Sequence, residues 1–376
     1  MDARVGQRVE ELDTPVVLVD LDRMEANIAR WQRLADASGV AFRPHVKTHK
    51  IPAIAAKQLE AGAVGIACAK VAEAEVFVDS GIEDVVVAYP VVGPEKWRRL
   101  AELARRARIT VNVESEVAAR GLSSAAAAAR ATIAVQVEID TGMHRCGFDS
   151  ADVDSIVRFC ATIESLPGVV LEGITTHRNV FFPGGESTPP EKAGFEEGTL
   201  LVELAGAIRS AGFDVREVTG GGSISGAGFA AAPGTTELRA GTYVFCDLMQ
   251  LGFGVAGWAD LALTVLSTVV SVHGGRRLTV DGGTKTFSGD RGVTDHCASE
   301  LVGLVAKAVD RDVQLDWLTE EHGMGVVGDD SVMVGDKLRF YPAHACTAVN
   351  LADELVGMRG GLVELVWPVL ARGKRM

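Results

Sequence analysis

Cationic and titratable side chains crowd into one short stretch of the sequence, FRPHVKTHK (42–50). A short apolar run leads into it, so these groups stand at the end of what reads as a buried strand. A lysine surrounded by other cations, such as Arg43, keeps its amine neutral more readily, and a neutral amine is a nucleophile. Lys47 and Lys50 both fit this description. We favour Lys47 because it stands nearer the end of the strand.

Similar groups follow other predicted strands. Arg145 comes after the run AVQVEID (134–140), His177 ends LEGITTH (171–177), and the glycine-rich loop TGGGSISGAG (219–228) continues a later strand. Successive backbone N–H groups in such a loop form a concave anion site, which favours a phosphate. The spacing is neither a dinucleotide fingerprint nor a Walker loop, so a nucleotide is not indicated. The alternative is a merely flexible loop.

A lysine at a strand end and a phosphate loop together suggest pyridoxal phosphate. This cofactor needs a lysine for its covalent link, a cradle for its phosphate and a group that faces its ring nitrogen. Lys47 supplies the first of these. A competing hypothesis is a metal-free sugar-phosphate enzyme, in which Lys47 only contacts the phosphate. A non-catalytic carrier of the cofactor is a third hypothesis, although such proteins consist of a single barrel.

A second type of site is suggested near the carboxyl end, in KLRFYPAHAC (337–346). His344 and Cys346 are two residues apart, and on an extended chain such residues point to the same face. Imidazole nitrogen and thiolate sulfur together suit Zn²⁺. Two protein ligands leave the shell open for water and substrate, as a catalytic metal requires. The alternative is a buried cysteine beside a core histidine.

The elements that must position these groups alternate over residues 15–245. Short apolar runs are followed by stretches with helical periodicity, such as residues 23–37 and 198–212. Continuous apolar strands favour a parallel sheet buried on both faces, and this number of units favours a (β/α)8 barrel, in which catalytic groups lie at the carboxyl ends of strands. A doubly wound open sheet is the alternative. The predicted strands are residues 16–20, 40–46, 64–69, 84–89, 109–114, 134–140, 171–177 and 216–221.

The texture of the sequence changes near residue 250. Strand-like runs separated by Gly, Asp and Pro predict a mostly antiparallel β domain, interrupted by one helix at 299–309. We therefore expect an α/β architecture: a barrel at 13–250 that binds the cofactor, and a β domain at 251–376, with residues 1–12, that carries the metal site.

Composition excludes several classes of function. The net charge is −13 and no long basic cluster occurs, which argues against nucleic acid as a partner. The charged start MDARVGQRVEEL is unlike a signal peptide, and the longest apolar region, 261–272, is too short to cross a membrane. The six cysteines show no CxxC spacing, so we expect reduced thiols in the cytoplasm.

Several motifs taken together resemble a known family. RPHVKTHK, GAVGIACAKVAEAE (62–75), EIDTGMHRCG (138–147), TGGGS (219–223), LRAGTYVF (238–245), EEHG (320–323) and PAHACTAVNL (342–351) are similar to the fold-type III, alanine racemase-like pyridoxal phosphate enzymes. Within these, the match is to D-threonine aldolases and eukaryotic-type D-serine dehydratases. It runs from about Asp13 to about Asp353. The combination of the lysine and HxC motifs is specific.

The resemblance implies roles for individual residues. Lys47 would be the lysine joined to pyridoxal phosphate, and Arg145 would face the pyridine nitrogen. A divalent metal, Mn²⁺, Zn²⁺ or Mg²⁺, would be bound by His344 and Cys346. The resemblance further implies a homodimer whose active site lies between the barrel and the β domain. The residues implied to hold the rest of the cofactor are Thr219, Gly221, Gly222, Ser223 and Tyr243.

The activity that the resemblance implies is the cleavage of a D-3-hydroxy amino acid, such as D-threonine to glycine and acetaldehyde. His177 or a metal-bound water would take the hydroxyl proton. The alternative is a D-serine dehydratase, which gives pyruvate and ammonia; a racemase has no use for a metal pair. Two departures bear mainly on the substrate: Ala69 replaces a glutamine, and the segment 174–185 has His177 and Arg178 where a tyrosine is expected. A third departure, Ser223 in place of a threonine, is a mild change.

Overall fold

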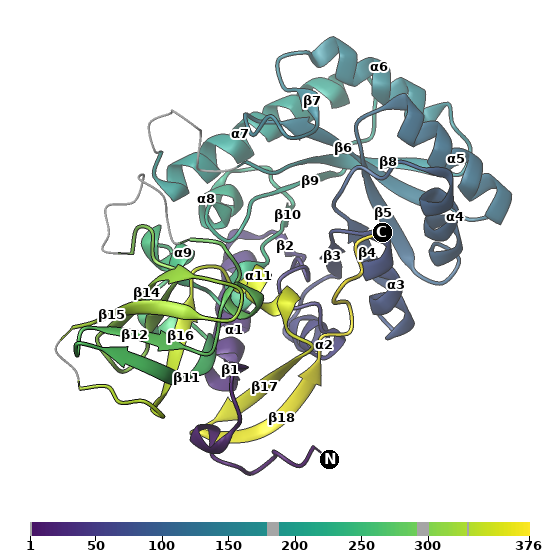
Figure 1. Cartoon of the computed structure of the whole chain (residues 1–376). Coiled ribbons are helices and arrows are strands. Elements are labelled where there is room, and N and C mark those ends of the chain that lie inside the picture. Colours follow the sequence, from purple (N-terminus) through teal and green to yellow (C-terminus); the bar gives the residue numbers. More distant parts are fainter. Residues whose placement is uncertain (1, 179–187, 292–300, 329–330) are drawn as a thin grey trace. The chain divides into compact units, whose positions relative to one another are not determined.

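The computed structural model describes residues 2–178, 188–291, 301–328 and 331–376. The chain forms two compact units, each with its own sheet (Figure 1). The barrel unit consists of Trp31–Lys47, Ile54–Gly241 and Gly373–Met376, and the β unit of Met1–Arg30, Thr48–Ala53 and Thr242–Arg372. Among the described residues, no helix combines the length and the apolar character needed to cross a membrane.

The barrel unit alternates strands and helices. Its strands are β2 Ala41–Phe42, β3 Ile66–Cys68, β4 Asp84–Val87, β5 Arg108–Val113, β6 Ile133–Asp140, β7 Phe148–Asp149, β8 Val169–Thr176, β9 Glu217–Gly220 and β10 Glu237–Leu238. Its helices are α3 Val71–Asp79, α4 Pro94–Leu103, α5 Glu116–Ala129, α6 Val153–Glu164, α7 Pro190–Ser210 and α8 Gly226–Ala231. Helices α1 Leu21–Ser38 and α2 Pro52–Glu60 contribute residues to both units.

Local sequence explains these elements. After its first residue, β5 is buried at every position, as expected for a parallel strand covered on both faces. Helices α5 and α6 begin after Ser115 and Asp152, whose side-chain oxygens accept hydrogen bonds from the backbone N–H groups of Ala118 and Ser155. These caps satisfy N–H groups that have no partner within the helix.

The sheet of the barrel unit closes on itself. Its strand order is β2-β10-β9-β8-β6-β5-β4-β3, and neighbours along this path are parallel. Beyond β2, His45 forms a parallel bridge with Ala67 of β3, and the Val46 N–H donates to the Ala67 carbonyl at 2.8 Å. The predicted barrel with a C-terminal antiparallel β domain is thereby confirmed.

One predicted barrel strand was wrong. Residues 16–20 form β1 (Val16–Asp20), which pairs antiparallel with β11 (Leu263–His273) and parallel with β17 (Glu354–Arg359) in the other sheet. The barrel instead contains β10, which sequence analysis overlooked because two residues form no apolar run. An apolar run indicates burial on both faces, and it does not indicate which sheet buries it.

The β unit is built on a second sheet with the order β12-β15-β14-β13-β16-β11-β1-β17-β18. Because β12 also pairs with β11, six antiparallel strands close into a small barrel. Its remaining strands are β12 Arg277–Val280, β13 Ala306–Ala308, β14 Val313–Leu318, β15 Gly323–Val327, β16 Lys337–Pro342 and β18 Leu362–Pro368. Its helices are α9 Leu248–Gly252, α10 Thr284–Phe287 and α11 Ala345–Leu351, with 3-10 turns at Val9–Glu11, Thr242–Val244 and Trp258–Asp260.

The helix predicted at 299–309 is not formed. Residues 299 and 300 lie outside the described residues, residues 301–303 form a turn, and β13 follows. Leu301 and Leu304 are buried in a cluster with Cys246, Leu248 and Tyr341. The spacing of apolar residues in this segment suits a helix, but the segment forms a turn and a strand. Packing against the surrounding residues overrides a weak local preference for helix.

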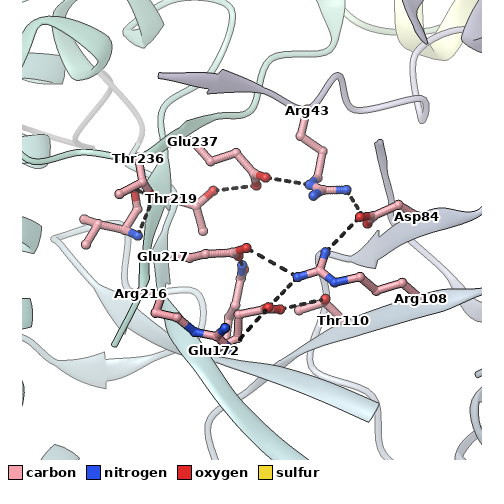
Figure 2. Close-up of polar contacts among 12 residues, drawn as sticks. Arg43, Asp84, Arg108, Thr110, Glu172, Arg216, Glu217, Thr219, Thr236 and Glu237 are labelled. Atoms are coloured by element: carbon pink, nitrogen blue, oxygen red, sulfur yellow. Dashed lines mark hydrogen bonds and ion pairs between the residues drawn. The ribbon is translucent and has the colours of Figure 1, made fainter. Parts of the chain in front are cut away.

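A network of ion pairs joins the amino-terminal parts of the barrel strands (Figure 2). Arg43, of which 2% of the side chain is exposed, lies 2.7 Å from Glu237 and 2.7 Å from Asp84. Arg108 bridges Asp84 to Glu172. The sequence analysis counted Arg43 among the cations near the reactive lysine, and this was wrong: two carboxylates neutralise its charge.

Candidate active site

The predicted chemical groups of the barrel unit gather at the carboxyl ends of its strands. Lys47 follows β2, Arg145 follows β6, His177 follows β8, and Gly221 and Gly222 follow β9. In a closed parallel barrel these ends share one rim, where catalytic groups are found. The pKa of His177 responds to the charges of both Lys47 and Arg145, so these side chains lie close enough to interact.

Lys47 is placed by the last backbone contacts of the β2 segment. The His45 N–H donates to the Ala240 carbonyl at 2.8 Å, and the Lys47 N–H donates to His45 Nδ1 at 3.3 Å. The Lys47 side chain is exposed. The rival lysine, Lys50, belongs to the β unit, is buried and has a left-handed backbone with φ 56°.

His177 is the group whose protonation the barrel unit alters most clearly. Burial lowers its pKa, the positive charges of Lys47, Arg145 and Arg239 lower it further, and together they bring it to about 3. The ring also forms a hydrogen bond with the backbone of Gly221. His177 is therefore a neutral imidazole near pH 7.

The glycine-rich loop requires its glycines. Gly221 has φ +74°, and a Cβ there would lie 2.8 Å from Leu238 Cδ1. A Cβ at Gly222 would lie 3.2 Å from the Cε1 atom of His177. The Ser223 hydroxyl accepts a hydrogen bond from the Gly241 N–H at 3.2 Å. The loop backbone thus borders the histidine directly, with no side chain at Gly222 between them.

The other predicted cofactor residues differ in what they offer. The Thr219 hydroxyl is buried and bonds to Glu237 at 3.2 Å, so its side chain belongs to the ion-pair network rather than to the loop. Arg145 is exposed and lies 3.9 Å from Glu138. Tyr243 is buried in a 3-10 turn of the β unit. Of the segment 174–185, residues 179–185 lie outside the described residues.

Sequence analysis missed two buried charged residues of the barrel unit. Arg239 follows β10, is 8% exposed, and its Nη1 atom has no hydrogen-bond partner among the described residues. Glu197 of α7 is fully buried, and burial raises its pKa to about 8. Arg239 could have been identified as a candidate site residue because it lies in the motif LRAGTYVF (238–245). No pattern in the sequence points to Glu197, because a glutamate in a helix is normally exposed.

These residues fit the cofactor that the sequence suggests. A phosphorylated pyridine aldehyde is anionic, and the barrel rim offers it cations and a loop of small residues. The unpaired Arg239 Nη1 is a buried donor for which an anionic ligand would be a partner. Lys47 provides the amine for the covalent link.

The second predicted site lies in the β unit. His344 follows β16 with extended backbone angles and caps α11, and Cys346 lies in the first turn of that helix. The expectation of an extended chain through both residues was therefore wrong. The two side chains nevertheless form a hydrogen bond, because a helix start brings residues two apart close together when the first has a non-helical backbone.

Neighbouring groups shift the pKa values of both members of this pair. Burial alone would lower the pKa of His344, but the hydrogen bond and charge of Cys346, with Asp247 and Asp290, raise it to about 10. Burial opposes ionisation of Cys346, yet His344 and the hydroxyls of Thr242 and Thr48 together lower its pKa. A thiolate is the form of cysteine that binds metals.

Polar groups surround the pair on several sides. Cys346 Sγ lies 3.2 Å from Thr48 Oγ1 and 3.4 Å from Thr242 Oγ1. His344 Nδ1 lies 2.7 Å from Asp290 Oδ2. Within the part of the chain that the structure describes, no group of three His, Cys, Asp or Glu side chains is arranged to hold a metal. The pair by itself offers a metal two ligands, one imidazole nitrogen and one sulfur.

Comparison with known proteins connects both sites to one family. The model of the alanine racemase N-terminal domain matches residues 19–248, and the model of a putative serine dehydratase domain matches residues 262–358. The family resemblance stated from the sequence is confirmed.

Three relatives are similar over most of the chain. D-threonine aldolase of Arthrobacter sp. is 35% identical, covering 99% of this chain and 96% of its own. D-threo-3-hydroxyaspartate dehydratase of Delftia sp. (strain HT23) is 33% identical, covering 89% and 91%. The crystal structure of D-threonine aldolase from Filomicrobium marinum has a TM-score of 0.89 at 33% identity and covers 100% of both chains. Two of these relatives are aldolases and one is a dehydratase.

Proposed function

We propose, because this chain belongs to the family of the alanine racemase N-terminal domain, that it is a pyridoxal phosphate-dependent lyase which cleaves D-3-hydroxy amino acids. D-Threonine would give glycine and acetaldehyde. The observation that carries the proposal is the neutral His177 among the cations Lys47, Arg145 and Arg239. The similarity to D-threonine aldolases over the whole chain supports it.

In this proposal the barrel residues hold the cofactor. Pyridoxal phosphate supplies an aldehyde that joins amines and a ring that accepts the electron pair released at the substrate Cα. Lys47 would hold the cofactor through its amine. Gly221, Gly222 and Ser223 would hold the phosphate, and Arg145 would contact the pyridine ring. Arg239 is a second candidate for contact with the cofactor, because its Nη1 lacks a partner among the described residues.

His177 is the proposed proton acceptor. Cleavage of the Cα–Cβ bond leaves an aldehyde only if the β-hydroxyl loses its proton. The charges of Lys47, Arg145 and Arg239 help to lower its pKa to about 3. An anionic cofactor bound among these cations would offset their charges and make the ring a stronger base.

His344 and Cys346 would hold the divalent metal. Such an ion acts as a Lewis acid and lowers the pKa of a hydroxyl that it binds, which assists the proton transfer. Cys346 contributes a thiolate, whose formation is favoured by His344 and two threonine hydroxyls. We infer Zn²⁺, Mn²⁺ or Mg²⁺ as the metal, and sulfur ligation favours Zn²⁺ among them.

A second candidate function is a dehydratase. The match of residues 262–358 to a putative serine dehydratase domain favours it, as does the 33% identity to D-threo-3-hydroxyaspartate dehydratase. Here the Cα–H and Cβ–O bonds break instead of the Cα–Cβ bond. Lys47 would take the Cα proton, and D-serine would give pyruvate and ammonia.

The products distinguish the two functions. D-Threonine, D-serine and D-3-hydroxyaspartate would be incubated with the holoenzyme, with and without a chelator, and assayed for glycine with aldehyde and for keto acid with ammonia. We expect glycine and acetaldehyde from D-threonine, and loss of activity with the chelator. Formation of keto acid without glycine would contradict the aldolase and support the dehydratase. Activity indifferent to the chelator would remove His344 and Cys346 from the mechanism.

We further propose that the enzyme acts as a homodimer in the cytoplasm. Light scattering on the purified holoenzyme tests the first point: a mass near the monomer value of 39.6 kDa would contradict it.

A further inference from the structure

A short hydrogen bond connects the proposed metal ligand His344 to a carboxylate. His344 Nδ1 lies 2.7 Å from Asp290 Oδ2, with 29% and 41% of the two side chains exposed. Asp290 stands three residues after the end of α10 and 54 residues before His344. No sequence motif brings these two residues together.

Asp290 is itself held in place. Its backbone N–H donates to Ser288 Oγ at 3.2 Å, and its Oδ2 lies 2.9 Å from the Thr347 hydroxyl. Thr347 Oγ1 also lies 2.9 Å from Ser288 Oγ and 3.2 Å from the His344 carbonyl oxygen. Ser288 has a left-handed backbone with φ 72°, which turns the chain after α10. The carboxylate is therefore fixed by contacts from both segments.

This bond determines which ring nitrogen of His344 faces a ligand. A carboxylate only accepts hydrogen bonds, so Nδ1 keeps its proton in both the charged and the neutral ring. A metal would therefore replace the proton on Nε2 and bind the lone pair there. In metal sites, a histidine commonly donates its other N–H to a carboxylate or carbonyl, which fixes the ring and makes the binding nitrogen more basic.

Asp247, the other carboxylate near His344, has a different task. Its Oδ1 accepts from the N–H groups of Met249 and Gln250 at 3.0 and 3.3 Å, and its Oδ2 accepts from Ala345 N–H at 2.8 Å. It caps α9 and anchors the start of α11. Asp290 is therefore the carboxylate that bonds to the His344 ring.

We propose that Asp290, supported by Thr347 and Ser288, is a positioning residue that orients His344 so that its Nε2 binds the divalent metal. This inference rests on the proposed metal site and adds a residue that makes no metal contact. The histidine would then be restrained before the metal arrives, so less ordering accompanies binding.

The test measures metal binding rather than activity. Holoenzyme stripped with EDTA is titrated with Mn²⁺ by calorimetry, with free Mn²⁺ counted by electron paramagnetic resonance. We expect Asp290→Ala to weaken Mn²⁺ binding by about 10–100-fold. Asp290→Asn weakens it less, because the amide oxygen still accepts from Nδ1–H. Thr347→Val has a smaller effect than Asp290→Ala, and Thr347→Ser restores wild-type affinity.

Two controls frame these variants. Asp310→Asn changes an exposed carboxylate of the same unit that pairs with Arg339 at 2.8 Å, and its Mn²⁺ affinity stays that of the wild type. His344→Ala removes the ligand itself. Thermal unfolding of each variant identifies any that fails to fold, and in that case the comparison of Thr347→Val with Thr347→Ser decides.

Three outcomes count against the inference. Wild-type affinity in Asp290→Ala, or in Thr347→Val should that variant decide, overturns it. Equal and severe losses in Asp290→Asn and Asp290→Ala make Asp290 a direct ligand instead. Wild-type protein that binds Mn²⁺ no better than His344→Ala removes the metal proposal, and the inference with it.

Discussion

The two units set their histidines in opposite states. In the barrel unit, burial and three cations bring the pKa of His177 to about 3. In the β unit, a thiol and two carboxylates raise the pKa of His344 to about 10, although burial opposes this. Burial acts in the same direction on both, so the difference comes from the charged neighbours.

This difference indicates what each region accepts. Cations around a neutral base suit an anionic cofactor and a substrate carboxylate. Carboxylates and a thiolate around an imidazole suit a metal cation. The chain encodes these two kinds of surroundings in separate units.

The largest effect is expected at the covalent anchor of the cationic region. Lys47→Arg keeps the positive charge but removes the reactive amine, so activity and the visible absorption band of the lysine-bound cofactor should both disappear. Lys50→Arg is the matched control and should keep both. If Lys47→Arg kept the absorption band, another lysine would be the one that binds the cofactor.

Removing the neutral base should be the next largest change. His177→Ala is expected to lower kcat on D-threonine by roughly 10²–10⁴-fold, the usual contribution of a positioned base, while the cofactor band remains. His144→Ala, at an exposed histidine bonded to Asp140, should have little effect. If the two variants were equally active, His177 would not be the base.

Arg43 tests whether every buried cation of the barrel unit belongs to the candidate active site. Its charge is paired with Glu237 and Asp84, so we expect a structural role. Arg43→Met should destabilise the protein by about 3–5 kcal/mol, since Glu237 and Asp84 lose a buried partner. Urea unfolding measures this loss. Arg106→Met, which breaks an exposed pair with Asp79, should cost less than about 1 kcal/mol. Comparable losses would contradict a structural role for the network.

In the anionic region, the thiolate should determine which metal binds. Cys346→Ser is expected to weaken Zn²⁺ binding by about 10–100-fold and Mn²⁺ binding less, because oxygen is a harder ligand than sulfur. Titration of the stripped holoenzyme with each ion gives the two ratios. Cys146→Ser, in the barrel unit, should change neither. Equal ratios in Cys346→Ser would argue against sulfur ligation.

Glu197 should make the stability of the protein depend on pH. Its folded pKa of about 8 lies above the ordinary value of 4.5, so between pH 4.5 and 8 the folded state holds more protons than the unfolded state. Its contribution to stability is therefore present at low pH and is lost as the pH rises through this window.

Glu197→Gln removes the titrating carboxyl group. The difference in the free energy of unfolding between this variant and the wild type should increase in favour of the variant as the pH rises from 5 to 8, by at most about 1.4 kcal/mol per pH unit. Urea unfolding at several pH values measures the difference. Glu203→Gln, exposed on the same helix, should show a constant difference. A constant difference for Glu197→Gln as well would contradict a raised pKa.

The sequence by itself determined the fold class and the chemical groups at the strand ends. Continuous apolar runs specify strands buried on both faces, and the turns after them must carry Lys47, His177 and the glycine loop, because strand ends are where a barrel exposes polar groups. His344 and Cys346 were also visible, since their spacing is local.

Only the tertiary structure decided which groups meet. The strand β1 pairs with β11 in the sheet of the β unit and not in the barrel. Arg43 forms ion pairs with Asp84 and Glu237. Asp290 bonds to His344, which is 54 residues away in the sequence. Sheet partners, ion pairs and hydrogen bonds between distant segments depend on packing in three dimensions, and a linear pattern of polar and apolar residues carries no record of them. The same holds for the opposite states of the two histidines, which follow from neighbours that the fold supplies.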